Sequence, residues 1–253
     1  KLNLTDEPFL EAALDDRNHL MRRAAADLLA KLPQSRLSQR MIQHVNGILN
    51  WTPAKNQTLI IQLPITITPA MLRDGIPNVK ESEWKRMASR FLTQIISRVP
   101  LEHWLQTWQT TPEQIAEEAL RSAWPRSLTA AFSTAAVRQN NEAWAKALII
   151  VNQFNTSTGR LVPFLSAASC FELMKQAAQQ STELQRPHPL YIFLQHWPGP
   201  WSVEMGRFWL DLFAQHLQKS NSEATNPTLN NLFKRFGQTC PPELADTAVS
   251  QLT

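Results

Sequence analysis

The strongest constraint on the fold is a pair of helical patterns, separated by a short polar segment, in residues 8–32. The first pattern has one apolar face, formed by Phe9, Leu10, Ala13 and Leu14. The second has an apolar stripe at about four-residue spacing, formed by Leu20, Met21, Ala24, Ala25, Leu28, Leu29 and Leu32. The polar segment between them, Asp15-Asp16-Arg17-Asn18, is rich in residues that cap helices. We therefore expect two antiparallel helices joined by a tight turn.

This hairpin resembles a HEAT repeat, a unit of stacked helical hairpins. The residues on the positions of the family pattern are Leu14, Asp16, Met21, Arg22, Ala25, Ala26 and Leu29, with Met21 in place of the usual β-branched residue. We expect Asp16 to cap the second helix, and Arg22 to reach back to the turn or to the aspartate of the next repeat. The small residues Ala24, Ala25 and Ala26 would let the two helices approach closely. The alternative is an ordinary helical hairpin within a globular domain.

Similar helical patterns follow along most of the chain. The sequence has only 6 glycines, which argues against β-rich folds, and many of its 17 prolines stand where a predicted helix starts or stops. We predict an all-α fold of HEAT-like helical hairpin repeats, an α-solenoid, in which residues 1–253 form a single helical-repeat domain. Because the first repeat begins so close to Lys1, the pattern is compatible with further repeats upstream in a longer protein.

Residues 50–78 break this regularity, because prolines interrupt the segment at Pro53, Pro64, Pro69 and Pro77. Residues 59–68 are rich in isoleucine and leucine, so we predict short extended pieces there and almost no strand outside residues 57–68. The apolar content predicts an ordered, irregular insertion that packs against the helices. In the turn from Arg73 to Ile76, we expect Gly75 to supply a positive φ.

Four motifs extend a second resemblance over most of the chain: DEPFLEAALDDR, RDGI, NNEAWAKALI and HWPGPWSVEM. With these motifs the sequence resembles a bacterial domain-of-unknown-function family, numbered fifty-six ninety-one. The resemblance implies a helical solenoid with an accessory role in an assembly. The genes of that family tend to accompany those for a MoxR-type ATPase, a von Willebrand factor A protein and a SWIM zinc-finger protein. The resemblance implies no activity and no functional residues.

The sequence contains no recognisable catalytic motif. The GxGxxG, Walker A, GxSxG and HExxH patterns are all absent, and the 6 histidines lack the spacing of a metal site. We therefore predict no catalytic residue, no cofactor and no bound metal. Cys170 and Cys240 stand far apart, which argues against a disulfide framework and favours a reducing compartment. No signal peptide or membrane-length apolar run is visible, so we expect a cytoplasmic protein.

Two basic clusters supply candidate binding residues. Arg22 and Arg23 lie in the first hairpin, and Arg86 and Arg90 stand at i, i+4 spacing on a later predicted helix. If these arginines line one concave surface, they can contact phosphate or an acidic partner. The alternative is solubilising charge combined with a structural arginine ladder.

Three functions remain open from the sequence. The first is a non-catalytic protein–protein interaction scaffold, whose partner contacts the concave side of the solenoid, the insertion and two accessible tryptophans, Trp51 and Trp201. The second is a HEAT-like nucleic-acid-binding protein, similar to DNA glycosylases of that type, with a basic concave face. The net charge of +4 is a small excess for this length, so we expect at most weak, non-specific nucleic-acid binding. The third is an enzyme of unrecognised type.

Overall fold

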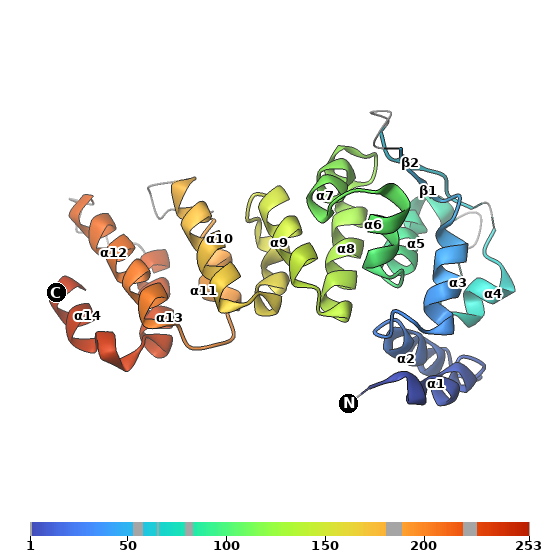
Figure 1. Ribbon diagram of the computed structural model, residues 1–253, viewed down its shortest axis with the longest axis horizontal. Coiled ribbons are helices and arrows are strands. Elements are labelled where there is room, and N and C mark those ends of the chain that lie inside the picture. The colour runs from blue at the N-terminus through green and yellow to red at the C-terminus, as the bar shows by residue number, and fades with distance from the viewer. Residues whose placement is uncertain are drawn as a thin grey trace. The chain divides into compact units, whose positions relative to one another are not determined.

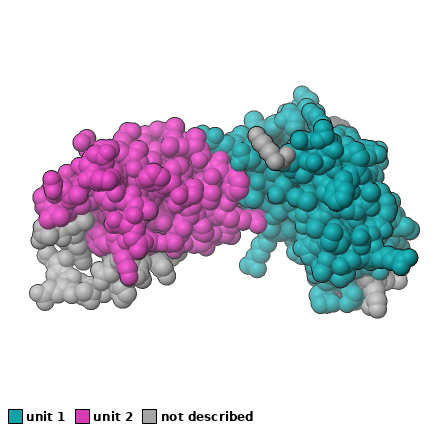
Figure 2. Space-filling model, turned by 90° about the horizontal axis from the view of Figure 1, so that it is seen from below, with its two compact units in different colours: residues 1–151 teal, residues 152–253 magenta. Residues whose placement is uncertain are grey.

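The computed structural model describes residues 2–52, 58–64, 66–78, 83–180, 189–219 and 227–252. The chain divides into two compact units, residues 1–151 and residues 152–253, which Figure 2 colours separately. Nearly all of the described regular structure is helical, and its strands form one small sheet (Figure 1). The prediction of an all-α fold is therefore confirmed. The HEAT-like solenoid and the single repeat domain stay predictions.

The first unit is built around closely packed helices. Its described elements are η1 (Leu4–Asp6), α1 (Glu7–Ala13), α2 (His19–Leu29), α3 (Arg36–Val45), β1 (Leu49–Asn50), β2 (Ile60–Ile61), α4 (Pro69–Arg73), α5 (Trp84–Ile96), α6 (Leu101–Trp108), α7 (Pro112–Arg121), α8 (Pro125–Gln139) and α9 (Glu142–Val151). Helix α8 packs against α5, α6, α7 and α9. Its Phe132 stacks on Trp144 of α9 and meets Trp104 of α6 edge-on, and all three side chains are buried. This aromatic cluster forms much of the core of the unit.

The second unit has its own aromatic core. Its described elements are η4 (Thr156–Phe164), α10 (Ala167–Gln179), α11 (Tyr191–His196), α12 (Val203–Lys219), α13 (Pro227–Thr239), η5 (Pro242–Leu244) and α14 (Ala245–Leu252). Trp209 and Phe213, one turn apart on α12, stack on each other and are fully buried. Gly206 lets α12 approach η5 closely, because a Cβ atom there would lie 2.6 Å from a methyl carbon of Leu244.

Helices α1 and α2 form the predicted hairpin and pack against each other. The expectation that Asp16 caps α2 is wrong. The cap is Asn18, whose Oδ1 accepts a hydrogen bond from the backbone N–H of Leu20 at 2.9 Å. Asp16 stands two residues before this cap, in the turn. Its Oδ1 accepts a hydrogen bond from the backbone N–H of Asn18 at 2.6 Å, so it orders the turn. The expected contact of Arg22 with the turn is confirmed, because its Nη1 donates to two backbone carbonyl oxygens there (2.8 and 3.2 Å).

The predicted apolar stripe of α2 is only partly buried. Ala25, Ala26 and Leu29 are buried where α2 packs on α1 and α3. Ala24 is exposed, so its expected role in close helix packing is wrong. The exposed large side chains of the stripe are Leu20, Met21 and Leu28. Helix α2 therefore buries a narrower face than its sequence pattern predicts.

The insertion is ordered where the structure describes it. Strand β2 lies within the predicted residues 57–68, and it pairs antiparallel with β1, which ends at the first residue of the insertion and lies outside that predicted range. The backbone N–H of Leu59 donates to Oε1 of the buried Glu118 on α7 at 3.0 Å, which attaches the insertion to the helices. The short helix α4 was not anticipated; Thr68 caps it and Pro69 starts it. Gly75 has φ +79°, as expected for the turn. Pro53 falls outside the described residues.

Candidate functional site

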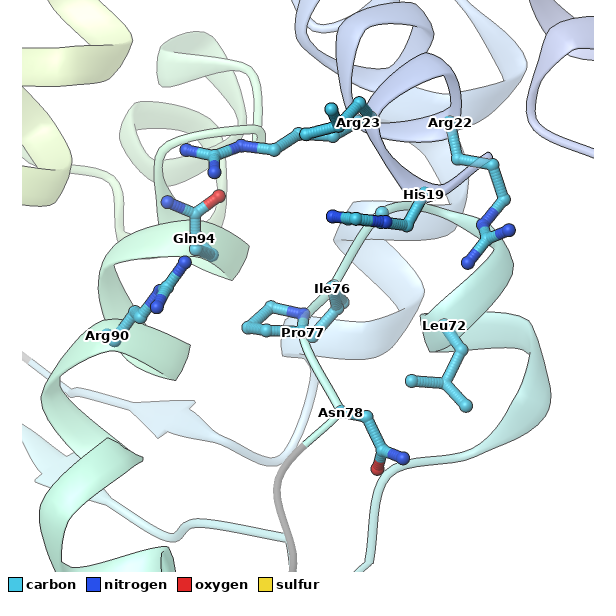
Figure 3. Close-up of a pocket in the computed structure, with 11 residues that line it drawn as sticks. His19, Arg22, Arg23, Leu72, Ile76, Pro77, Asn78, Arg90 and Gln94 are labelled. Atoms are coloured by element: carbon cyan, nitrogen blue, oxygen red, sulfur yellow. The ribbon is translucent and has the colours of Figure 1, made fainter. Parts of the chain in front are cut away.

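A basic pocket in the first unit is the candidate functional site (Figure 3). It has a volume of about 450 Å³ and lies between α2, the last part of the insertion and α5. The residues that line it are His19, Leu20, Arg22, Arg23, Leu72, Gly75, Ile76, Pro77, Asn78, Arg90 and Gln94. These described lining residues include three arginines and no acidic residue. The pocket therefore presents positive charge to anything that enters it.

Two helices supply the polar walls of the basic pocket. His19 and Arg23 stand one turn apart at the start of α2, and Arg90 and Gln94 stand one turn apart on α5. Figure 3 shows Arg23 extending from α2 toward Gln94, with the His19 ring pointing into the same gap. Side chains from two helices that are distant in the sequence therefore converge on one space.

A glycine in the insertion sets the shape of the remaining wall. A Cβ atom on Gly75 would lie 2.9 Å from the Cβ atom of Ala26 on α2, and its φ of +79° is itself unfavourable for other residues. Glycine therefore allows the turn to rest directly on α2. The next residues, Ile76 and Pro77, then add apolar surface to the pocket.

The three lining arginines differ in how many hydrogen bonds and ion pairs their guanidinium groups make within the protein. The Arg22 guanidinium is tied to backbone carbonyl oxygens of the turn before α2. Arg23 makes only a long ion pair, 3.9 Å from its Nε to Oδ2 of Asp27, and its side chain is 50% exposed. Arg90 is exposed and has no hydrogen bond or ion pair with another described residue. Arg23 and Arg90 therefore keep most of their donors available for a ligand.

Asp27 links the pocket to the core, and we call Asp27, Arg23, Arg98 and Arg138 the Asp27 cluster. Oδ1 of Asp27 accepts hydrogen bonds from Nη2 of Arg98 at 3.0 Å and from Nη2 of Arg138 at 2.7 Å. The Arg98 side chain is completely buried, its Nη1 donates to the carbonyl oxygen of Gly75 at 3.3 Å, and its Nε has no described partner. Among the described residues, Asp27 is the one carboxylate paired with these three arginines.

The pKa values of the two buried arginines in the Asp27 cluster reflect burial first and the surrounding charges second. Burial lowers the pKa of Arg98; Asp27 opposes that effect, and the positive charges of Arg138 and Arg23 reinforce it. Burial also lowers the pKa of Arg138, again opposed by Asp27 and reinforced by Arg23. Burial is therefore the main cause of both lowered pKa values, and repulsion from the neighbouring arginines adds a smaller contribution in the same direction.

A second charged group, the Asp74 network, holds α1, α3 and α4 together. Its members are Glu11, Asp15, Arg40, His44, Arg73 and Asp74. Arg40 of α3 lies 2.8 Å from Oδ1 of the buried Asp74 and 2.9 Å from Oε1 of Glu11 on α1. Nε2 of His44 lies 3.1 Å from the other Asp74 oxygen. Because Asp74 directly precedes Gly75, this network fixes the end of α4 from which the pocket wall continues.

The Asp74 network predicts a dependence of stability on pH. Burial raises the pKa of Asp74, but hydrogen bonds and charge interactions with His44 and Arg40 together outweigh burial and hold that pKa below its usual value of 3.8. A lowered pKa in the folded state means that ionised Asp74 stabilises the fold above pH 3.8, and that this contribution is lost as the pH falls below it. We expect Asp74→Asn to lower the free energy of unfolding by about 2 kcal/mol at pH 7. The loss stays this small because Arg40 keeps Glu11 as a second carboxylate partner.

Urea unfolding of the wild type and of Asp74→Asn at pH 7 and at pH 3 would measure this dependence. The gap in the free energy of unfolding between the two proteins should narrow at pH 3. The exposed Asp246 offers a matched control, and Asp246→Asn should change little at either pH. A gap of constant size would show that the charge of Asp74 contributes nothing.

The structure brings together three of the predicted binding residues, Arg22, Arg23 and Arg90, in the basic pocket. The predicted insertion supplies a further wall, from Leu72 to Asn78. The sequence had raised the possibility that the two arginine clusters meet on one concave surface. Arg22 and Arg23 of the first cluster meet Arg90 of the second in the basic pocket, and a binding role rests on this observation.

The other three predicted residues lie outside the basic pocket. Arg86 is exposed, and its Nη2 lies 2.7 Å from Oε1 of Glu83. Trp51 is half-buried and packs edge-on against Trp108, with 5.5 Å between ring centroids. Trp201, in the second unit, is 5% exposed, and its Nε1 donates to Oγ1 of Thr239 at 2.8 Å. The expectation that Trp201 is accessible is therefore wrong.

Sequence reasoning missed His19, Gln94 and the Asp27 cluster. One signal was present for Arg98, which stands between Ile95 and Val99 in an apolar stripe and therefore places a charge on a buried face. No sequence pattern connects Asp27 with Arg138, since these residues are 111 positions apart.

The described residues include no group of three histidine, cysteine, aspartate or glutamate side chains placed to hold a metal ion. In the same ranges, no helix is long and apolar enough to cross a membrane.

Both cysteines are free, and burial raises the pKa of Cys170 to about 12, so its thiol stays protonated at neutral pH. The guanidinium groups that line the described pocket can bind an anion.

Comparison with known proteins matches residues 1–253 to the model of one family, described as a family of unknown function (DUF5691). No curated protein and no solved structure matches the chain significantly. The match agrees with the family that the four sequence motifs resemble. The family description assigns no activity, so functional inference rests on the geometry of the pocket.

Proposed function

The chain belongs to the family of unknown function DUF5691, and we propose that it is a non-catalytic protein–protein interaction scaffold that binds an acidic segment of a partner in the basic pocket. In this proposal it serves as an accessory subunit of a bacterial cytoplasmic assembly, and its helices stack as HEAT-like repeats. The concave pocket gives such a subunit a specific attachment point for another chain.

The observation that carries the proposal is the meeting of Arg22, Arg23 and Arg90 in one pocket without an acidic residue among the described lining. Arginine is favoured at interfaces because its planar guanidinium pairs with a carboxylate through two parallel hydrogen bonds. The Asp74 network offers a contrast, since each of its arginines has a close carboxylate partner. None of the three lining arginines has a described carboxylate partner this close, and such positive charge in a concave site is better explained by recognition than by stability.

The apolar part of the lining favours a peptide segment as the occupant. Leu20, Leu72, Ile76 and Pro77 give the pocket apolar surface beside its guanidinium groups. A partner segment with an acidic side chain next to an apolar one would match both. The first partner to test is a MoxR-type ATPase, which the family resemblance suggests.

Nucleic acid is the alternative occupant. A binding face for duplex nucleic acid uses many phosphate contacts along an extended surface, whereas the arginines here gather in one pocket of about 450 Å³. We therefore favour protein recognition, and we expect nucleic-acid binding to be weak, non-specific and abolished by moderate salt.

The test uses the full-length protein, tagged and recovered from its host together with its partners. We expect the double variant Arg23→Glu and Arg90→Glu to lose the partner that the wild type recovers, because two attractive charges become repulsive. The matched control is Arg126→Glu with Arg207→Glu, which makes the same change of net charge at exposed residues outside the pocket. The control should retain the partner.

Equal recovery by the wild type and by both double variants would overturn the proposal. Recovery of nucleic acid, with tight binding of a duplex at physiological salt, would replace it with the nucleic-acid alternative. Circular dichroism of each variant confirms that a lost partner does not reflect a lost fold.

A further inference from the structure

We propose that the anion recognised in the basic pocket is a phosphate monoester dianion, carried on a larger molecule, and that Arg23 and Arg90 bind it from opposite walls. The inference rests on the proposed function in one respect, because it names the chemical class of the group that the same pocket binds. It adds a requirement for two negative charges on one group, which an ordinary acidic side chain lacks.

The balance of charge around the pocket favours a dianion over a single carboxylate. Arg23, Arg98 and Arg138 share one described carboxylate, Asp27, and Arg90 has none. These four guanidinium groups, of which Arg23 and Arg90 line the pocket, and one carboxylate leave an excess of three positive charges before Arg22 is counted. A carboxylate supplies one negative charge, whereas a phosphate monoester supplies about 1.5 to 2 at neutral pH.

The arrangement of donors also suits phosphate. In Figure 3, Arg23 reaches into the pocket from α2, and Arg90 projects from α5 on the facing side. A tetrahedral phosphate has three oxygens that can accept hydrogen bonds from two directions at once, whereas a planar carboxylate offers two oxygens in one plane. His19 begins α2, which has 11 residues, so the positive end of that helix adds to the attraction.

The apolar wall indicates that the phosphate is attached to something larger. Ile76 and Pro77 line the pocket beside the guanidinium groups, and a free phosphate ion would leave this surface unused. Two sources carry the same chemistry, a phosphorylated side chain of a protein partner and a small organic phosphate such as a nucleotide. Both present a phosphate monoester or terminal phosphate next to a less polar body.

Isothermal titration calorimetry with the full-length protein can test the inference with defined probes. The first probe is a capped pentapeptide with one phosphoserine among alanines, and the same peptide with glutamate or serine in that position is the comparison. Adenosine diphosphate and inorganic phosphate form the small-molecule arm. We expect the phosphoserine peptide to bind at least tenfold more tightly than the glutamate peptide at pH 7.5, and the preference to shrink at pH 5.5, where the phosphate becomes a monoanion.

The pocket variants Arg23→Ala and Arg90→Ala should each weaken binding of the phosphoserine peptide at least tenfold. Both side chains are largely exposed, so each variant should fold. Arg126→Ala and Arg207→Ala serve as exposed controls outside the pocket and should bind like the wild type. Binding of adenosine diphosphate that is tighter than that of the peptide, and equally sensitive to Arg23→Ala, would support the inference with a nucleotide as the source.

Equal affinity for the glutamate and phosphoserine peptides would overturn the inference while leaving the proposed function intact, because an acidic segment would suffice. Absence of binding by every phosphate probe at millimolar concentration would also overturn it. The proposed function fails by a different result, recovery of the protein partner by the variant Arg23→Glu and Arg90→Glu. The two failures are therefore distinguishable.

Discussion

Replacing Ala25 by glutamate is expected to destabilise the first unit by about 4 kcal/mol, the largest effect that we expect from any single substitution. Ala25 is 3% exposed on the face of α2 that packs against α1 and α3. A glutamate there must either bury a carboxylate without a partner or force the helices apart. Thermal unfolding of the affected unit should begin at least 10 °C lower than in the wild type.

The neighbouring residue supplies a matched control for this prediction. Ala24 is exposed on the same helix, so Ala24→Glu makes the same chemical change with the same helix propensity but without burial. We expect it to alter the free energy of unfolding by less than about 0.5 kcal/mol. Similar melting of the two variants would show that α2 presents a different face to its neighbours.

Replacing Asp27 by asparagine is expected to cost about 3 kcal/mol, even though the substitution preserves the shape of the side chain. Arg98 is completely buried and has no other described carboxylate within ion-pair distance, so the variant leaves its charge uncompensated. Arg138 loses the same partner. The Asp27 side chain is 35% exposed, and water therefore screens part of the loss, which places the estimate at the low end for a buried ion pair.

Hydrogen–deuterium exchange would show which segments Asp27→Asn destabilises. Peptides from α2, from the turn that follows α5 and from α8 should exchange faster in Asp27→Asn, since the Asp27 cluster joins these three segments. Asp211→Asn changes an exposed aspartate of the second unit and should leave the exchange pattern unaltered. If Asp27→Asn melts and exchanges like this control, the buried arginines do not depend on Asp27.

The helices were predictable because their signals are local. Thr111 and Pro112 mark the start of α7, and the structure has Thr111 as its cap with Pro112 as its first residue. The capping of α2 was harder, since Asp16 and Asn18 are both good capping residues and only the three-dimensional turn decides between them. The exposure of Leu20 and Met21 depends on which neighbours α2 has, and a helical periodicity carries no information on that point.

The pocket could be anticipated only in part. The basic character of Arg22, Arg23 and Arg90 is visible in the sequence, and so is the tight turn at Gly75. Their convergence depends on how α2 and α5 pack across the insertion, which involves contacts between residues more than fifty positions apart. A single sequence gives no signal for such a long-range contact. The residues of α2 do not determine the local sequence pattern of α5, and the residues of α5 do not determine that of α2.

Because three arginines share one carboxylate, the stability of the free protein and its affinity for an anion make opposite demands on Arg23. In the free protein the charge of Arg23 repels two arginines that folding has already placed close together, and a bound anion would remove that repulsion. A neutral side chain in place of Arg23 would therefore make the free protein more stable and would weaken its binding of the anion. Directed evolution for heat resistance alone would tend to discard this arginine, whereas selection on an assembled complex would retain it.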